Sequence, residues 1–324
     1  MTELLSRLSK HLVLAIPATM LLGFCFGLAA PSDWLKSLIV PLTFLMVYPM
    51  MVTLRLGKVL EGGDGKAQLL AQALNFGVIP FVALALGHLF FAGEAGYAVG
   101  LLLAALLPTS GMTISWTGLA GGNLGAAVKM TVVGLILGSL ATPFYLQWLM
   151  GARIDVDLGA VFAQIAFVVL LPMLAGYVTQ RRLVARHGQK RFQSEWAPRF
   201  PPFSTLGVLG IVFVAMALKA GQLLERPAEL LHLVLPLLAL YAINYLISSL
   251  VARLLLPRGD AIALVYGTVM RNLSIALALA MNAFGGAGSD AALVITLAYV
   301  VQVQSAAWFV RLTDRLFGRR EATA

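Results

Sequence analysis

The chain consists mainly of long runs of apolar residues separated by short polar segments. A helix needs about 20 apolar residues to cross a hydrocarbon layer about 30 Å thick. Strands of a membrane barrel instead alternate in polarity over about ten residues, whereas these runs are apolar on all sides. The pattern therefore predicts an all-α integral membrane protein. The runs of sufficient length predict ten transmembrane helices, at about residues 10–29, 34–54, 68–91, 96–120, 124–149, 159–179, 203–221, 229–255, 260–284 and 290–312.

The order of the spans suggests a duplicated unit, because five spans precede residue 155 and five follow it. With an odd number of helices in each unit, the second copy would cross the membrane in the opposite sense. We therefore predict one membrane transporter domain over residues 1–324, built as two inverted five-helix repeats at about 10–149 and 159–312. A polar stretch at 180–202 lies within the second repeat and is interpreted as a solvated cytoplasmic linker.

Composition supports a lipid environment and argues against nucleic acid as a partner. Apolar residues make up 60% of the chain, charged residues make up 11%, and the mean hydropathy is +0.90. Ordinary soluble domains carry about 25% charged residues. The net charge of +9 does not indicate nucleic-acid binding, because Lys and Arg lie in short loops and form no continuous basic face.

The distribution of Lys and Arg between the spans indicates the orientation of the chain. With the N-terminus inside, seventeen of these residues fall on the cytoplasmic side and four on the other side. Cytoplasmic loops carry an excess of Lys and Arg, so we predict a multi-pass inner-membrane protein with both termini in the cytoplasm. The first two cytoplasmic segments hold Arg7, Lys10, Arg55, Lys58 and Lys66, and the four opposing cations are Lys36, Arg153, Lys219 and Arg226.

The fourth predicted span is interrupted near its middle by residues that weaken a helix. The segment LLPTSGMTISW places Pro108, Thr109, Ser110, Gly111 and Thr113 close together. Proline lacks a backbone N–H and glycine weakens the helix, so backbone polar groups are freed at a depth where lipid cannot satisfy them. Such a backbone must face a polar cavity or neighbouring protein.

The ninth predicted span contains a second polar cluster, formed by Gly267, Thr268, Arg271, Asn272 and Ser274. An arginine at this depth costs about 2.5 to 3.5 kcal/mol on insertion scales, so we expect Arg271 to point inward. No Asp or Glu lies in the interior of any predicted span, so a substrate anion could supply the missing negative charge. A structural ion pair or a cap on freed carbonyl groups is the alternative role for Arg271.

Other polar residues lie at comparable depth, and hydrogen bonds between helices explain each of them at least as well as contact with a ligand. These are Tyr48, Asn75, Thr131, Gln302 and Gln304. Lys129, near the start of the fifth span, is interpreted as reaching toward the cytoplasmic surface. The four histidines lie near predicted helix ends or in the linker, which gives no support for a proton-relay histidine. Cys25 is the only cysteine, so an intrachain disulfide is excluded.

The two interruptions occupy the penultimate helices of the two predicted repeats. Paired broken helices in corresponding positions indicate the binding site of a secondary transporter. We therefore predict a carrier that moves a small anion by alternating access, with Na⁺ or H⁺ as candidate coupling ions and no cofactor. The predicted substrate site comprises Arg271, Asn272, Ser274, Thr109, Ser110, Gly111 and Thr113, and the candidate ion ligands are Asn75, Thr113, Thr131 and Thr268.

Two other classes of protein remain as alternatives. An ion channel or a structural membrane subunit is disfavoured by the paired broken helices. An intramembrane enzyme is disfavoured because the chain has no HExxH motif, no G-x-S-x-G elbow and no buried pair of carboxylates.

Motifs in both interrupted spans have the spacing of a known superfamily. Pro108, Met112, Trp116 and Gly122 fit a P-C-T-A-M pattern followed by a Trp and a glycine-rich end, and Met270 and Asn272 fit an E-x-x-M-Q-N pattern. Together with the order of the spans, these motifs make the chain resemble the bile acid:sodium symporter and arsenite-carrier superfamily. The resemblance implies ten helices in two inverted repeats, with helices four and nine broken and crossing at the substrate and ion sites.

The chain departs from this resemblance at residues that carry chemistry in the superfamily. Thr109 stands where the arsenite carriers have a reactive cysteine, and Ser274 stands where their ninth helix has a glutamate. Gly267 and Arg271 stand where the sodium symporters have a sodium-binding glutamate and a glutamine. A sodium ion at this place would meet the positive charge of Arg271 instead of a carboxylate. At about 4 Å and an effective dielectric near 20, this turns roughly 4 kcal/mol of attraction for sodium into a similar repulsion. We therefore expect a small organic carboxylate as the substrate, with an arsenic oxyanion as the alternative.

Overall fold

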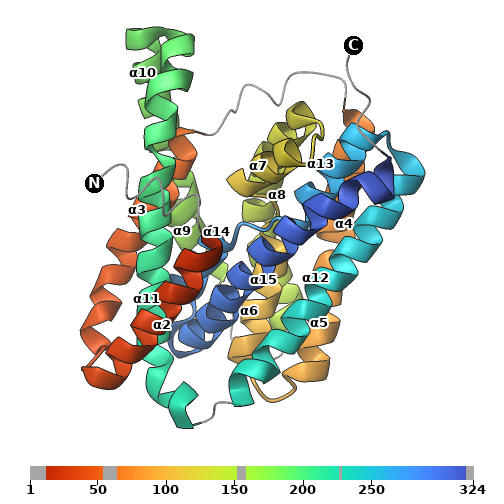
Figure 1. Cartoon of the computed structure of the whole chain (residues 1–324). Helices are drawn as coiled ribbons and strands as arrows, with labels where there is room; N and C mark the ends of the chain where they lie inside the picture. The colour runs from red at the N-terminus through yellow and green to blue at the C-terminus, as the bar shows by residue number, and fades with distance from the viewer. Residues whose placement is uncertain (1–11, 54–63, 152–157, 226–227, 319–324) are drawn as a thin grey trace.

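The computed structural model describes residues 12–53, 64–151, 158–225 and 228–318 (Figure 1). Within these ranges the regular secondary structure is helical. Six helical stretches are long and apolar enough to cross a membrane, namely Asp33–Val52, Gly65–Phe90, Leu124–Met150, Leu171–Gly221, Ala228–Leu255 and Gly285–Phe317. Shorter apolar helices cover Leu14–Ala29, Ala95–Leu106 and Leu273–Ala283. The chain is thus a multi-pass, all-helical membrane protein, and the ten-span inverted repeat stays a prediction.

The helices follow the predicted apolar runs, with breaks that divide several of them. The first half contains α2 (Leu12–Ala29), η1 (Asp33–Leu38), α3 (Ile39–Val52), α4 (Gly65–Gly77), α5 (Ile79–Phe90), α6 (Ala95–Leu106), α7 (Gly111–Leu119) and α8 (Leu124–Met150). The second half contains α9 (Leu158–Ile165), η3 (Ala166–Leu170), α10 (Leu171–Arg191), η4 (Phe192–Trp196), η5 (Ala197–Arg199), α11 (Pro201–Glu225), α12 (Ala228–Leu255), α13 (Arg258–Val269), α14 (Leu273–Ala283) and α15 (Gly285–Phe317).

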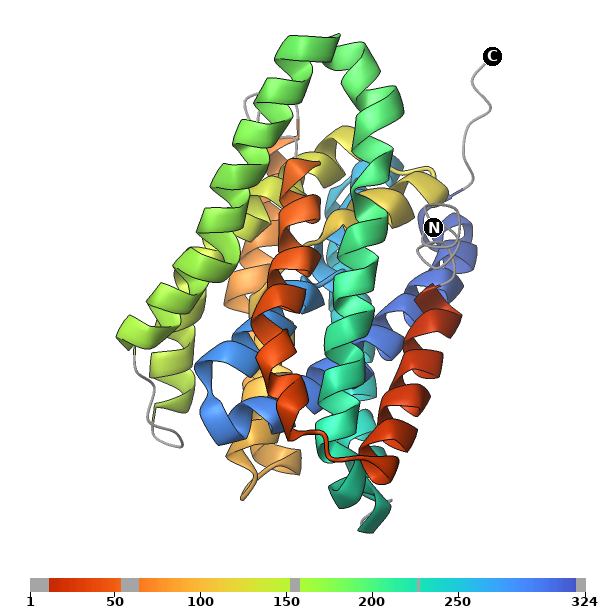
Figure 2. The same cartoon turned by 90° about the vertical axis from the view of Figure 1, so that its left-hand side faces the viewer.

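The helices form two groups that lie side by side (Figures 1 and 2). One group contains α2, α3, α10 and α11, in which α11 packs against both α2 and α3. Gly23 of α2 permits this close approach, since a Cβ there would lie 2.5 Å from the carbonyl oxygen of Phe213 on α11. The other group contains α4, α5, α6, α7, α8, α12, α13, α14 and α15, and it holds most of the fully buried residues. Helices α14 and α15 also contact the first group.

The polar stretch at 180–202, predicted as a solvated cytoplasmic linker, is mostly exposed and mostly helical, and its place on the cytoplasmic side stays a prediction. Helix α10 continues to Arg191, and the short helices η4 and η5 lead into α11. Leu, Ala, Arg and Gln are good helix formers, and Arg191 pairs with Glu195 one turn later at 2.9 Å. Polarity therefore places this stretch in solvent without unwinding it. In Figure 2, α10 and α11 extend beyond the other helices as a hairpin.

The third predicted span is also divided, because Val78 separates α4 from α5. Pro80 lies in the first turn of α5, where its missing N–H costs no helical hydrogen bond.

The structure does not describe all of the cations that indicate the orientation of the chain. The cations Arg7, Lys10, Arg55, Lys58, Arg153 and Arg226 lie outside the described residues.

Candidate functional site

Both predicted interruptions are present, and the structure brings them together. The chain leaves α6 at Leu106 and α13 at Val269, and each helix is followed by a new one after a few residues. The two unwound segments meet where Pro108 and Arg271 form an isolated antiparallel bridge. The backbone N–H of Asn272 donates to the carbonyl of Leu107 at 2.8 Å. The two breaks therefore form one site at the crossing of the two spans.

The first break contains a residue in a left-handed backbone conformation. Thr109 has φ of +64° although it is β-branched, and it is fully buried. Such a conformation is disfavoured for a branched residue, so the surrounding structure must hold it. The Thr109 hydroxyl is within hydrogen-bond distance of the carbonyls of Pro108 at 2.6 Å and Thr131 at 3.2 Å. Packing against α8 thus fixes the direction of the chain at the break.

The hydroxyls that follow Thr109 are used to begin α7. The Ser110 side chain accepts from the backbone N–H of Met112 at 3.3 Å, and the Thr113 hydroxyl accepts from the N–H of Ser110 at 3.2 Å. This reciprocal arrangement is a capping box. Asn272 caps α14 in a similar way, since its side-chain oxygen accepts from the N–H of Ile275 at 3.3 Å. The positive dipole ends of α7 and α14 therefore both face the crossing.

Three buried side-chain amides satisfy the carbonyl groups that the second break frees. Asn75 of α4 donates to Gly267 at 3.0 Å, and Asn244 of α12 donates to Thr268 at 2.9 Å. Gln302 of α15 donates to the carbonyl of Arg271 at 3.2 Å. These bonds replace helical hydrogen bonds that end at the break. The freed carbonyl groups therefore avoid the free-energy cost of unsatisfied backbone in a membrane.

Arg271 lies deep in the protein, and its side chain is not paired with an acid in the part of the chain that the structure describes. The residue is 3% exposed. None of the ion pairs among the described residues involves Arg271, and neither of its Nη atoms has a hydrogen-bond partner there. The Nδ2 atom of the adjacent Asn272 is a further buried donor without a partner in the described part of the chain. The crossing therefore presents several unsatisfied donors beside one buried positive charge.

The remaining predicted residues are divided between the site and its surroundings. Ser274 is at the start of α14, where its hydroxyl lies 2.6 Å from that of Tyr299 on α15. Gly111 is the first residue of α7 and is exposed. Among the candidate ion ligands, the hydroxyl of Thr131 bonds to the carbonyl of Ala127 in its own helix at 2.8 Å.

The Thr268 hydroxyl bonds toward α12, and it makes no hydrogen bond to Thr131 of α8 among the described residues. Its hydroxyl lies 2.6 Å from that of Ser248 and 2.9 Å from the carbonyl of Val265, to which it donates. The structure therefore brings Thr109 and Thr131 together, while it places the Thr268 hydroxyl in a separate cluster.

Several residues of the site are not among the predicted site residues. Gln302 contacts both backbone polar groups of Arg271, and Tyr241 of α12 donates to Gln302 at 2.8 Å. Asn244, Ser248 and Tyr299 complete the polar contacts around the second break. The only signal for these residues in the sequence is a polar side chain within an apolar run, which also occurs at residues that do not reach the site.

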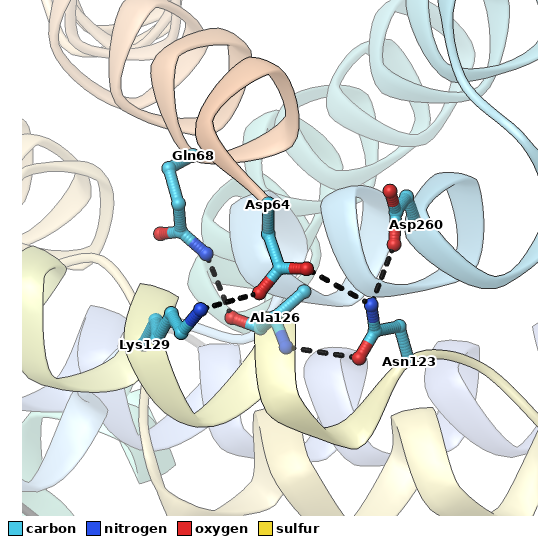
Figure 3. A network of polar contacts seen from close by, with 6 residues as sticks. All are labelled: Asp64, Gln68, Asn123, Ala126, Lys129 and Asp260. Carbon is cyan, nitrogen blue, oxygen red and sulfur yellow. Dashed lines mark hydrogen bonds and ion pairs between the residues drawn. The ribbon is translucent and has the colours of Figure 1, made fainter. Parts of the chain in front are cut away.

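A second polar network lies where α4, α8 and α13 meet (Figure 3). Lys129 donates to Asp64 at 2.9 Å, and Asn123 donates to Asp64 at 3.2 Å and to Asp260 at 2.7 Å. Asn123 also caps α8, while Gln68 donates to the carbonyl of Ala126 at 2.9 Å. Lys129 is 6% exposed, so its ammonium group is buried in this network, and its direction toward the cytoplasmic surface stays a prediction. A carboxylate at the start of α4 makes burial of this ammonium group tolerable.

Comparisons with known proteins match the chain to one family model and to several bacterial relatives. The model of the sodium bile acid symporter family matches residues 40–226. The arsenical-resistance protein Acr3 of Alkaliphilus metalliredigens (strain QYMF) is 22% identical over 94% of this chain and 92% of its own length. The sodium-dependent transporter YocS of Bacillus subtilis (strain 168) is 27% identical over 80% of this chain and 78% of its own. The protein YbaS of the same strain is 23% identical over 73% of this chain and 75% of its own.

Proposed function

The chain belongs to the sodium bile acid symporter family and is a secondary transporter of that superfamily, and from this premise we propose that its substrate is a small organic carboxylate. Membership in a family of transporters agrees with the prediction that the chain is not an enzyme. The solute would bind at the crossing of the two broken spans and move by alternating access.

The observation that carries the choice of substrate is the buried guanidinium of Arg271. It is 3% exposed, and its two Nη atoms have no partner among the described residues. A carboxylate can accept two parallel hydrogen bonds from a guanidinium and neutralise its charge. The amide nitrogen of Asn272 and the positive ends of α7 and α14 would add further stabilisation of an anion. Ser110 and Thr113 begin α7 and Ser274 begins α14, so their hydroxyls are candidates for further contacts once the solute is bound.

Export of arsenic compounds is the second candidate, because the chain matches arsenical-resistance proteins over most of its length. Two features of the site favour a carboxylate over arsenite. Arsenite in its neutral form offers no negative charge to Arg271. The only cysteine, Cys25, is exposed on α2, so the crossing contains no thiol that could bind trivalent arsenic.

The coupling ion is a separate proposal, and it concerns oxygen atoms around both breaks. Carbonyl groups at the crossing, with Thr113, Thr131 and Asn75, offer oxygen atoms of the kind that bind sodium. The Oδ1 atom of Asn75 is buried without a partner among the described residues. Protons are the alternative coupling ion.

Transport into proteoliposomes tests the choice of substrate. We expect uptake of at least one of radiolabelled acetate, lactate, succinate and benzoate, and we expect Arg271→Gln to abolish it while the protein still inserts. Arsenite and arsenate serve as comparison solutes, and imposed sodium or proton gradients identify the coupling ion. Undiminished carboxylate uptake by Arg271→Gln, or transport of arsenite alone, would show that the carboxylate proposal is wrong.

A further inference from the structure

The polar contacts of Gln302 single it out among the side chains of α15. Its side-chain oxygen accepts from the backbone N–H of Arg271 at 2.8 Å, and its side-chain nitrogen donates to the carbonyl of Arg271 at 3.2 Å. One amide thus contacts both backbone polar groups of one residue, as a neighbouring strand would in a sheet. Gln302 is fully buried, so water does not compete for these bonds.

The backbone at the second break leaves the helical conformation, which explains why it needs such a partner. Met270 is extended, with φ of −77° and ψ of 92°, and Asn272 has φ of −84° and ψ of 68°. The N–H of Asn272 donates to Leu107 of the first break, while the N–H and the carbonyl of Arg271 face Gln302. The peptide of Arg271 is therefore held from both sides.

The Gln302 amide is itself oriented by a second residue. The hydroxyl of Tyr241 on α12 donates to the side-chain oxygen of Gln302 at 2.8 Å. An amide whose oxygen accepts from two donors cannot exchange its oxygen and nitrogen without losing both bonds. Contacts from Gln302 on α15, Tyr241 on α12 and Leu107 at the end of α6 therefore determine where the Arg271 side chain leaves the backbone.

We propose that Gln302 is the positioning residue of the anion site, which sets the place and direction of the Arg271 guanidinium without touching the solute. This proposal rests on the proposed function, because it concerns the same site. A side chain that hydrogen-bonds an anion at two points must be placed within a fraction of an ångström, so loss of its backbone support weakens binding.

Binding measurements on purified protein test the proposal, with acetate, lactate, succinate and benzoate as the probes. Gln302→Leu leaves an N–H and a carbonyl of Arg271 unsatisfied, and we expect the Kd to rise on the order of tenfold or more. Gln304→Leu is the matched control, because it makes the same change two residues away on α15, at a residue that is only partly buried. We expect its Kd to equal that of the unmodified protein.

Gln302→Glu separates a positioning role from a merely structural one. A protonated carboxyl group can accept from the Arg271 N–H and donate to its carbonyl, as the amide does, whereas an ionised carboxylate can only accept. We expect binding by Gln302→Glu, relative to the unmodified protein at the same pH, to recover as the pH falls from about 8 to about 5. Binding by Gln302→Leu should show no such recovery.

The possible results distinguish this proposal from the proposed function. If the unmodified protein binds none of the four carboxylates, the anion site is wrong and the role of Gln302 in it is overturned as well. If the unmodified protein binds and Arg271→Gln does not, while Gln302→Leu binds normally, only the positioning role is overturned. If Gln302→Leu does not fold, Gln302→Glu alone decides. Binding by Gln302→Glu relative to the unmodified protein that does not change with pH overturns the positioning role.

A second inference rests on a different observation, an ion pair between the two helix groups. Lys219 of α11 contacts Asp290 of α15, and their side chains are 14% and 31% exposed. Lys219 lies in the last turns of α11 and Asp290 in the first turns of α15, so the pair lies at one end of the bundle. By contrast, the pair between Lys36 and Asp33 lies within η1 and is exposed.

We infer that Lys219 and Asp290 form a latch that holds this end closed and must separate in each transport cycle. Alternating access requires the two groups to part at each end in turn. A partly buried ion pair across the boundary favours the closed arrangement, because the attraction between the two charges is lost when the groups part. Removal of either charge should therefore shift the population toward the arrangement that is open at this end.

Distances between spin labels test the latch without knowledge of the substrate. Labels at Leu224 and Ser289, in a Cys25→Ser background, report the separation of α11 from α15. We expect Lys219→Met and Asp290→Asn to broaden the distance distribution toward longer values, and the exchanged pair Lys219→Asp with Asp290→Lys to restore it. Lys36→Met is the matched control and should change nothing. The latch is overturned if both single variants give the same distance distribution as the parent protein. It is also overturned if the variant with the exchanged charges keeps the longer distances.

Discussion

The backbone N–H of Asn272 donates to the carbonyl of Leu107 at 2.8 Å, which joins the two broken spans where both have lost their helical hydrogen bonds. Residues 165 positions apart in the chain thereby stabilise each other's unwound backbone. The polar groups that remain unsatisfied at this junction are mainly donors, among them both Nη atoms of Arg271 and the Nδ2 atom of Asn272. The crossing is therefore suited to an anion.

Arg271→Lys should retain part of the carboxylate affinity that Arg271→Gln loses. Lysine keeps the positive charge but cannot offer the planar pair of donors that a guanidinium presents to a carboxylate. We expect the KM for carboxylate uptake to rise on the order of tenfold for Arg271→Lys, with uptake still measurable. A lysine variant that behaves like the glutamine variant would show that the charge alone does not hold the solute.

Removal of the amides that bond to the carbonyls of α13 should destabilise the fold. Asn244→Leu leaves the carbonyl of Thr268 without its side-chain donor, and Asn75→Leu does the same to Gly267. An unsatisfied buried group costs about 1 to 3 kcal/mol, and we expect each variant to lose stability in that range. Thermal unfolding in detergent measures the change.

Asn282→Leu is the matched control for these amides. The Asn282 side chain is only partly buried, and it donates to the carbonyl of Ala278 in its own helix at 2.7 Å and to the Thr43 hydroxyl at 3.4 Å. We expect a smaller loss of stability than for Asn75→Leu or Asn244→Leu. Equal losses for all three variants would contradict a special role for amides at the break.

The interruptions could be predicted from the sequence because their causes are local. Pro108 removes a backbone donor within an apolar run, and Arg271 is too costly to face lipid. The partners of the freed backbone groups could not be predicted in the same way. The bond from Asn75 to Gly267 joins residues 192 positions apart, and it depends on how α4 packs against α13.

Gln302 and Gln304 show the same limit within one helix. Both are glutamines in the same apolar run, and the sequence does not distinguish which of them contacts the site. Only the direction in which α15 packs against the break turns Gln302 toward Arg271. The helical structure of residues 180–202 could not be predicted for another reason, because polarity predicts exposure to water but does not decide whether the backbone is helical.

Lys129→Met should destabilise the network at the junction of α4, α8 and α13. The side chains of Lys129 and Asp64 are 8% and 13% exposed, so the variant leaves a nearly buried carboxylate without its cation. Breaking such a pair costs about 3 kcal/mol. Asp64→Asn in the same chain removes the uncompensated charge, and we expect the double variant to be more stable than Lys129→Met alone.

Denaturation of the two single variants and the double variant completes a double-mutant cycle for this pair. Lys36→Met breaks the exposed pair with Asp33 and serves as the control, for which we expect little change. If the effects of Lys129→Met and Asp64→Asn simply add, the two charges do not stabilise each other.

Gly134→Ala should disturb the first break from the side of α8. A Cβ at Gly134 would lie 2.6 Å from the Thr109 hydroxyl oxygen and 3.2 Å from its methyl carbon. Thr109 is fully buried in a left-handed conformation, so it has little freedom to move away. Overpacking of this kind costs about 1 to 3 kcal/mol, which outweighs the gain of up to about 1 kcal/mol from replacing glycine in a helix.

Thr109→Ala relieves this clash and therefore tests its origin. The alanine removes both atoms that a Cβ at Gly134 would meet first, so Gly134→Ala should cost less in the Thr109→Ala background than alone. Gly221→Ala on α11 is the control, because a Cβ there would meet nothing within 4 Å. We expect it to be neutral or stabilising in thermal unfolding. A Gly134→Ala penalty that is the same in both backgrounds would mean that contact with Thr109 is not its cause.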